Sequence, residues 1–258
     1  MATFDTVKEE YNAQAKAYND EYPSLPYGQL EIQLFGAALG DATGQTVLDL
    51  GGGTGLRARQ ALEAGAASVD VVDISAEMLN VGKDIERELG RDKTRWFEAD
   101  ASKPLDRLGL LPGQYDIVMA NWLFDHAENE ESLDGMWKNI DAHLKPGGRF
   151  VGIRSGDPRS DALSKTDKYG IRYTNIQDIP GGVSLRFFMG TNPPINFDAK
   201  LVESSYSGST KYHTKYGLED VQLIPAEEMP SAREDPDFWK VFLDNPPMIA
   251  VKARKRVE

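Results

Sequence analysis

The fold of this chain is decided by one stretch, Val47-Leu-Asp-Leu-Gly-Gly-Gly-Thr-Gly55. Residues 47–50 are typical of a short buried β-strand, and a helical pattern begins directly after the glycines, at about Leu56. Because glycine lacks a Cβ, a turn of this kind brings the backbone close to a ligand and adopts positive φ. The stretch therefore predicts a ligand-binding turn between a strand and a helix.

Short apolar stretches alternate with helical patterns on the C-terminal side of this turn. Such alternation is typical of a mostly parallel sheet with helices on both faces. We predict an α/β, Rossmann-like, mostly parallel seven-stranded sheet with helices on both faces, an N-terminal helical cover and a β-rich lid insertion. Its strands are expected at 47–50, 69–72, 95–98, 115–120, 149–154, 221–225 and 248–253.

A single domain is expected over the whole chain, since 258 residues suffice for one large core. The alternation breaks near residue 163, where a hairpin pattern and a further strand pattern occupy a segment too short for a core of its own. The predicted parts are an N-terminal helical cap at 1–42, a core at 43–162 and 209–258, and the lid insertion at 163–208.

Composition and charge exclude several classes of protein. The chain has 41 acidic and 29 basic residues, and its only cationic cluster is the terminal stretch Lys252–Arg256, whereas nucleic-acid binding needs a concentrated positive face. It has no cysteine and three histidines, which argues against thiolate chemistry and against a metal site. No signal-peptide pattern and no apolar stretch of about 20 residues is visible. We expect a cytoplasmic monomer or homodimer that binds a small-molecule substrate and neither nucleic acid nor membrane.

The glycines alone do not identify the ligand, because Gly53, Gly55 and Ala58 also fit the dinucleotide-binding pattern. Asp49 separates the two interpretations. A diphosphate at a helix N-terminus requires amide donors and no nearby anion, whereas a carboxylate suits a cationic ligand such as S-adenosylmethionine, which carries a sulfonium and an ammonium. An Asp49 that only ties the loop amides together is compatible with either ligand.

The motif Asp49-x-Gly-x-Gly-x-Gly55 resembles the signature loop of class I S-adenosylmethionine-dependent methyltransferases. The resemblance continues at Asp73, at Asp100–Ala101 and at Leu144-Lys-Pro-Gly-Gly148, and covers about residues 43–155. It implies S-adenosyl-L-methionine as the cofactor and S-adenosyl-L-homocysteine as the product.

The resemblance also implies roles for the residues at the strand ends. Asp73 is expected to accept both ribose hydroxyls, and Asp100 the adenine amino group, while the Ala101 amide donates to a ring nitrogen. Ile74 and Met78 are expected on the two sides of the adenine, although simple core packing also explains Met78.

The methionine end of the cofactor is expected to contact a second group of residues. The Asn121 carbonyl is placed near the ammonium, beside Asp49 and the turn glycines Gly51 and Gly53. Tyr11 and Tyr18, on the predicted N-terminal helix, are candidates for holding the carboxylate, with packing of the helix face as the alternative.

His126 is the first candidate for the catalytic residue, as general base or as substrate anchor, because it follows the predicted strand 115–120. Asp125 and Glu128 are the alternative groups at this position, and His126 as a partly exposed loop residue is the alternative without a function. Methyl transfer itself is an in-line displacement that depends on positioning and exclusion of water.

The predicted substrate-binding residues are Trp122, His126, Tyr173, Phe188 and His213. Methyltransferases that act on nucleic-acid amino groups or protein glutamine carry Asn/Asp-Pro-Pro-aromatic after the fourth strand, whereas this chain has Asn121-Trp-Leu-Phe124. That difference points to a small acceptor. Aromatic side chains of the insertion either wall an aromatic or heterocyclic acceptor or pack the hairpin onto the sheet.

The sequence thus predicts an enzyme that moves a methyl group from S-adenosylmethionine to an O, N or S atom of a small aromatic or heterocyclic metabolite. Two alternatives stay open. One is an NAD(P)-dependent oxidoreductase, and the other is a non-methylating protein that retains S-adenosylmethionine binding.

Overall fold

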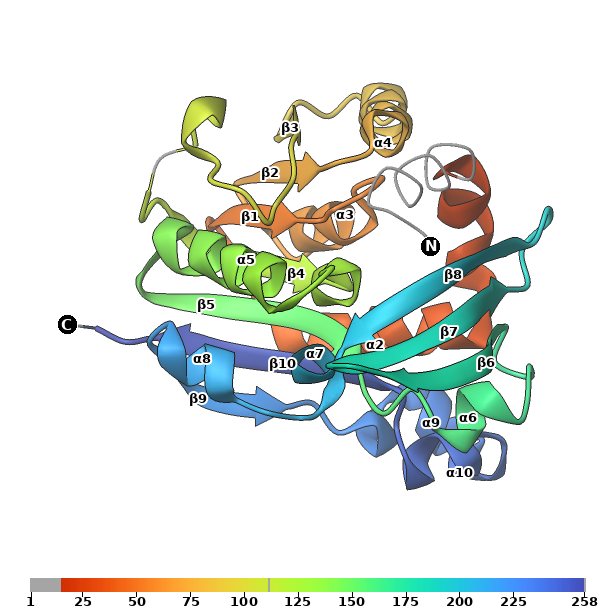
Figure 1. Cartoon of the computed structure of the whole chain (residues 1–258). Helices are drawn as coiled ribbons and strands as arrows, with labels where there is room; N and C mark the ends of the chain where they lie inside the picture. Colours follow the sequence, from red (N-terminus) through yellow and green to blue (C-terminus); the bar gives the residue numbers. More distant parts are fainter. Residues whose placement is uncertain (1–14, 111, 258) are drawn as a thin grey trace.

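The computed structural model describes residues 15–110 and 112–257 and contains a seven-stranded sheet in the order β3-β2-β1-β4-β5-β10-β9 (Figure 1). Neighbouring strands pair in parallel except β10, which is antiparallel to both β5 and β9. The predicted fold class is therefore confirmed. The strands are β1 (Thr46–Leu50), β2 (Ser68–Asp73), β3 (Thr94–Glu98), β4 (Tyr115–Asn121), β5 (Leu144–Ser155), β9 (Leu218–Leu223) and β10 (Met248–Lys255).

Helices connect these strands, and polar side chains define where several of them begin. The Ser75 hydroxyl accepts a hydrogen bond from the Met78 amide at the start of α4, and Asn129 caps α5 in the same way. The longer helices are α2 (Pro26–Leu39), α3 (Leu56–Glu63), α4 (Ala76–Glu88), α5 (Glu130–His143) and α10 (Pro236–Asp244). The shorter ones are α6 (Asp161–Ser164), α7 (Glu203–Tyr206), α8 (Lys211–Lys215), α9 (Pro230–Glu234), and the 3-10 turns η1 (Tyr22–Ser24), η2 (Asp106–Leu108), η3 (Leu123–His126) and η4 (Ala226–Glu228). Residues 15–21 are also helical, and the first part of the predicted N-terminal helix lies outside the described residues.

The sheet is buried on both faces, which explains the continuously apolar strands. On one face Val47 and Ile117 pack with α2, α3 and α10, and on the other Leu48 and Val118 pack with α5. The side-chain alternation of β1 and β4 thus divides the core into two layers. The carboxyl ends of these strands remain available for a site.

A second, three-stranded antiparallel sheet is formed by β6 (Ile171–Ile179), β7 (Gly182–Met189) and β8 (Ile195–Val202), in the order β6-β7-β8. It lies at one side of the main sheet, where β8 contacts η3, the turn that follows β4 (Figure 1). Its buried residues, Val183 and Leu185 among them, belong to the same hydrophobic cluster as Val47 and Ile117. The segment predicted as an insertion therefore packs into the core of the main domain.

None of the helices in the described ranges is both long and apolar enough to cross a bilayer.

Candidate active site

Two adjoining cavities open at the carboxyl ends of the main strands. The smaller has a volume of about 130 Å³ and is lined by the glycine turn and by the ends of β1, β2 and β4. The larger has a volume of about 620 Å³ and lies between η3 and the second sheet. Tyr18, Trp122 and His126 line both cavities and mark the junction between them.

The glycine turn has the backbone geometry that its sequence predicts. Gly51, Gly53 and Gly55 have φ of 72°, 54° and 75°, in the left-handed region that disfavours other residues. The Gly51 amide donates to the Val72 carbonyl at 2.8 Å, which fixes the turn to β2. The turn therefore lies across the ends of β1 and β2 and forms one wall of the smaller cavity.

Asp49 is fully buried beneath this turn, at 0% exposure. Neither carboxylate oxygen of Asp49 has a hydrogen-bond partner within the described part of the chain. Burial, and then the charge of Asp73, raise the pKa of Asp49 to about 7, against a small lowering by Arg57. A cation bound in the smaller cavity would supply the missing partner and favour the ionised form.

Asp73 ends β2 and faces the same cavity. Its Oδ2 accepts the Gly53 amide at 2.8 Å and its Oδ1 accepts the Ser75 amide at 2.8 Å. Each carboxylate oxygen can accept more than one hydrogen bond, so the predicted ribose contacts remain compatible with these bonds. Ile74 and Met78 line the cavity next to Asp73.

Asp100, Ala101 and Asn121 complete the wall of the smaller cavity. Asp100 Oδ1 accepts the Ser102 amide at 2.8 Å, and the Ala101 carbonyl accepts Asn139 Nδ2 at 2.8 Å, so the loop after β3 is held in place. The Asn121 side chain is buried, and neither its Oδ1 nor its Nδ2 has a partner among the residues described. The structure thus brings together all the predicted cofactor residues that it describes, and Tyr11 lies outside the described residues.

The junction is built around Trp122, whose backbone has a φ of 60°, which is rare for a residue with a large side chain. The Trp122 amide donates to the Ile153 carbonyl at 2.7 Å, and Nε1 of the indole donates to Glu31 Oε2 at 2.8 Å. Tyr18 stacks on Tyr22, with ring centroids 5.0 Å apart.

Sequence reasoning missed the group that holds Trp122. Glu31 of α2 is 1% exposed and accepts Arg57 Nη2 at 2.6 Å and Nε at 3.0 Å, together with the Tyr22 hydroxyl. Arg57 and Glu31 also line the smaller cavity. The sequence does carry a signal for this group. Glu31 lies four positions after Tyr27 on the apolar face of α2, and a charged residue there indicates a buried partner.

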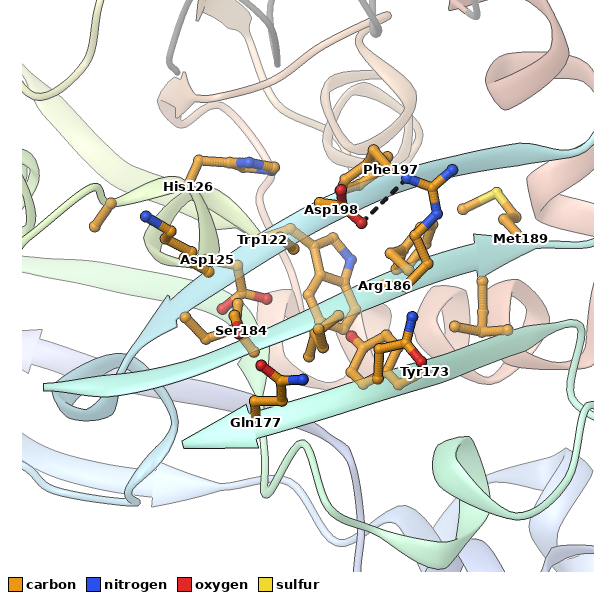
Figure 2. Close-up of a pocket in the computed structure, with 18 of the residues that line it drawn as sticks. Trp122, Asp125, His126, Tyr173, Gln177, Ser184, Arg186, Met189, Phe197 and Asp198 are labelled. Atoms are coloured by element: carbon orange, nitrogen blue, oxygen red, sulfur yellow. Dashed lines mark hydrogen bonds and ion pairs between the residues drawn. The ribbon is translucent and has the colours of Figure 1, made fainter. Parts of the chain in front are cut away.

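The wall of the larger cavity contains seven aromatic side chains and the half-buried carboxylate of Asp125. Figure 2 shows Trp122, Asp125 and His126 over strands β6 to β8, from which Tyr173 and Phe197 project toward the same space. Asp125 Oδ2 accepts the Ser155 hydroxyl at 2.7 Å, and Asp125 Oδ1 is buried with no partner in the described ranges. Burial raises the pKa of Asp125 to about 6, although the hydrogen bonds from Ser155 and the charge of Arg154 oppose the shift.

His126 is half-buried at the junction, and desolvation lowers its pKa to about 4. The imidazole is therefore neutral near pH 7. It lies where the two cavities meet.

Two predicted substrate residues do not line the cavity. Phe188 is 37% exposed, because Phe187 takes the inward position on β7 and stacks on Phe197 with ring centroids 4.7 Å apart. His213 is buried on the far face of the main sheet, where its ring packs against Trp137 at 4.6 Å and Phe150 at 5.8 Å between centroids. Both predictions are corrected by the geometry. Tyr173, also predicted, does line the cavity.

No cluster of three or more His, Cys, Asp or Glu side chains suited to a metal ion occurs within residues 15–110 and 112–257.

The glycine turn, the acids at the strand ends and the sheet order give the chain the architecture of class I S-adenosylmethionine-dependent methyltransferases, which its sequence motifs resemble. Residues 47–148 match the family described as "Methyltransferase domain". Among curated proteins, the chain is 35% identical over 130 residues to the ubiquinone/menaquinone biosynthesis C-methyltransferase UbiE of Vibrio vulnificus. That match covers 49% of this chain and 47% of the relative, so the chain spans about half the length of the curated relatives it matches.

Solved structures share the architecture at low sequence identity. An S-adenosylmethionine-dependent methyltransferase from Clostridium acetobutylicum has a TM-score of 0.61 at 16% identity, over 98% of this chain and 99% of the other. The [4+2]-cyclase SpnF has a TM-score of 0.62 at 14% identity, over 100% and 98% of the two chains. At these identities the likeness concerns the fold alone, and the cyclase indicates that the fold accommodates more than one reaction.

Proposed function

We propose that this chain binds S-adenosylmethionine in the smaller cavity and transfers its methyl group to a small ring compound held in the larger one. The observation that carries the proposal is the buried carboxylate of Asp49 beneath the glycine turn, which has no hydrogen-bond partner in the described part of the chain. Burying a carboxylate without a partner is costly, and a positively charged ligand removes that cost.

The residues present fit the cofactor at each end. Asp73 stands at the end of β2, and each of its carboxylate oxygens can accept more than one hydrogen bond, as ribose hydroxyls require; Asp100 and Ala101 provide an acceptor and an amide for adenine. Asn121 and Asp49 offer unpaired oxygens for an ammonium group. A diphosphate in the same position would lie beside two buried or half-buried carboxylates, which argues against a dinucleotide.

Bound S-adenosylmethionine supplies an electrophilic methyl group on a cationic sulfur. The chain contributes position and exclusion of water, the two effects on which such a displacement mainly depends. Trp122, fixed by Glu31, separates the two cavities, and His126 stands at their junction as the proposed anchor or base for the acceptor. A neutral imidazole fits either role, since it donates one hydrogen bond and accepts another.

A ring-shaped acceptor is supported by the lining of the larger cavity. Tyr18, Tyr27, Trp122, Tyr173 and Phe187 all contribute to its wall, and aromatic faces favour a planar ligand. The sequence alone predicted an O, N or S acceptor atom. The UbiE relative is a C-methyltransferase, so carbon joins the candidate acceptor atoms.

Incubation with methyl-labelled S-adenosylmethionine and a panel of hydroxylated, amino and thiol ring compounds tests this function. We expect label in at least one ring product, together with S-adenosylhomocysteine. If S-adenosylhomocysteine binds but no compound of the panel receives the label, the non-methylating alternative is favoured.

A further inference from the structure

Two polar atoms in the wall of the larger cavity are buried without hydrogen-bond partners among residues 15–110 and 112–257. They are Asp125 Oδ1, on η3, and the hydroxyl of Tyr27, on α2, and neither makes a hydrogen bond to the described residues. Tyr27 is 3% exposed, so its hydroxyl cannot turn toward bulk solvent. Buried donors and acceptors are nearly always satisfied in folded proteins, so this pair indicates a ligand group that bonds to both.

Both groups line the larger cavity, and the charge of Asp125 reaches Tyr27. Burial raises the pKa of Tyr27 well above its usual value, and Tyr173, Glu31 and then Asp125 raise it further. The tyrosine therefore remains protonated and presents an O–H donor. The carboxylate is held from behind, because its other oxygen accepts the Ser155 hydroxyl at 2.7 Å.

The kind of ligand group follows from the hydrogen bonds that it must make. A hydroxyl donates its proton to Asp125 Oδ1 and accepts the proton of Tyr27, so both buried groups are satisfied. An ammonium has no lone pair and leaves the Tyr27 O–H without an acceptor, which is costly in a buried site. A carboxylate ligand is repelled by Asp125.

Resting on the proposed function, we infer that Asp125 and Tyr27 bind a hydroxyl group of the ring acceptor, and that Asp125 accepts its proton. In that step the O–H bond breaks, the proton joins Asp125 Oδ1, and the electron pair stays on the acceptor oxygen, shared with the ring. The acceptor thereby becomes the nucleophile, while the Tyr27 hydroxyl stabilises the developing oxyanion.

The protonation behaviour of the neighbouring residues supports this assignment. The pKa of Asp125 is raised to about 6 and that of His126 is lowered to about 4, so the carboxylate is the stronger base of the two. The groups that face Asp125 are Ser155 and Arg154 of β5 and Tyr27 of α2. None of these loses a proton near pH 6, so Asp125 is the one among these groups that is expected to titrate there.

The test uses the full chain saturated with S-adenosylhomocysteine and three probes with the same ring: 1-naphthol, 1-methoxynaphthalene and 1-naphthylmethylammonium. Calorimetric titration measures each affinity. We expect 1-naphthol to bind at least about tenfold more tightly than either analogue, and its affinity to fall as the pH is lowered through about 6.

Two variants and one control make the test specific. Asp125→Ala and Tyr27→Phe should each reduce the preference for 1-naphthol to less than about threefold, and Asp125→Ala should abolish its pH dependence. Tyr27→Phe removes a hydroxyl without a protein partner, so it should leave the folded state intact. Ser184→Ala, in the wall of the same cavity, should keep the full preference.

Four results would each overturn the inference. Two concern the analogues: 1-methoxynaphthalene binds as tightly as 1-naphthol, or the ammonium compound binds more tightly. The other two are a preference for 1-naphthol that survives both substitutions, and no binding of any probe to the saturated protein. Failure of S-adenosylhomocysteine to bind the unmodified chain is a different result, and it would refute the proposed function on which the inference rests.

Discussion

The ionisation of Asp49 should control cofactor affinity, and the size of the effect follows from its pKa of about 7. Near neutral pH the free protein carries Asp49 partly protonated, because burial and the charge of Asp73 disfavour the carboxylate. Binding of a cation favours the ionised form, so the complex releases a proton. Because Asp49 must lose its proton when the cofactor binds, S-adenosylmethionine should bind about eightfold more weakly at pH 6 than at pH 7.5.

Isothermal titration calorimetry in two buffers of different ionisation enthalpy measures both the affinity and the number of protons released. Asp49→Asn should bind the cofactor more weakly, release no proton, and show little change between the two pH values. Asp116→Asn is the control, because Asp116 pairs with Lys145 and Thr46 near the opposite ends of the strands. An unchanged proton release in Asp49→Asn would refute the assigned role of this carboxylate.

Three further results are expected. Asp73→Ala should weaken S-adenosylhomocysteine binding by about 1–3 kcal/mol through loss of charge-assisted hydrogen bonds, and an unchanged affinity in calorimetry would remove Asp73 from the ribose site. His126→Ala should lower methyl transfer about 10²-fold while cofactor affinity stays nearly constant, whereas equal loss of both would assign His126 a structural role. Glu31→Ala should cost about 3–5 kcal/mol in urea unfolding, because Arg57 is left buried without its carboxylate; a loss below about 1 kcal/mol would contradict the buried pair.

The stability effect of Asp49 has a definite sign. Its folded-state pKa, about 7, lies above the ordinary value of 3.8, so the folded protein binds the proton more tightly than the unfolded chain. The free energy by which this protonation stabilises the folded state is fully present below about pH 4 and is lost as the pH rises through 7. Asp49 thus acts against the stability of the free protein at neutral pH, in keeping with a residue retained for binding.

The sequence predicted the main sheet and the residues that line the smaller cavity, because both depend on local patterns. The glycine turn requires positive φ at fixed positions, and acids such as Asp73 and Asp100 stand at the ends of strands that the apolar pattern defines. In a parallel sheet these ends meet at one edge, so their sequence positions suffice to place them together.

The acceptor side was less predictable because it depends on register and on distant pairings. Phe187 and Phe188 differ by one position, and the pairing of β7 with β6 and β8 decides which of the two faces inward. The bond between Glu31 and Trp122 joins positions 91 residues apart, a separation at which no local pattern reports contact.

The most direct test of this account is a calorimetric comparison of two ligands on the purified chain. If a carboxylate-flanked glycine turn selects a sulfonium nucleoside, S-adenosylmethionine should bind in the micromolar range and NAD(P) should give no measurable heat of binding. Saturable binding of NAD(P), or failure of S-adenosylmethionine to bind, would contradict it.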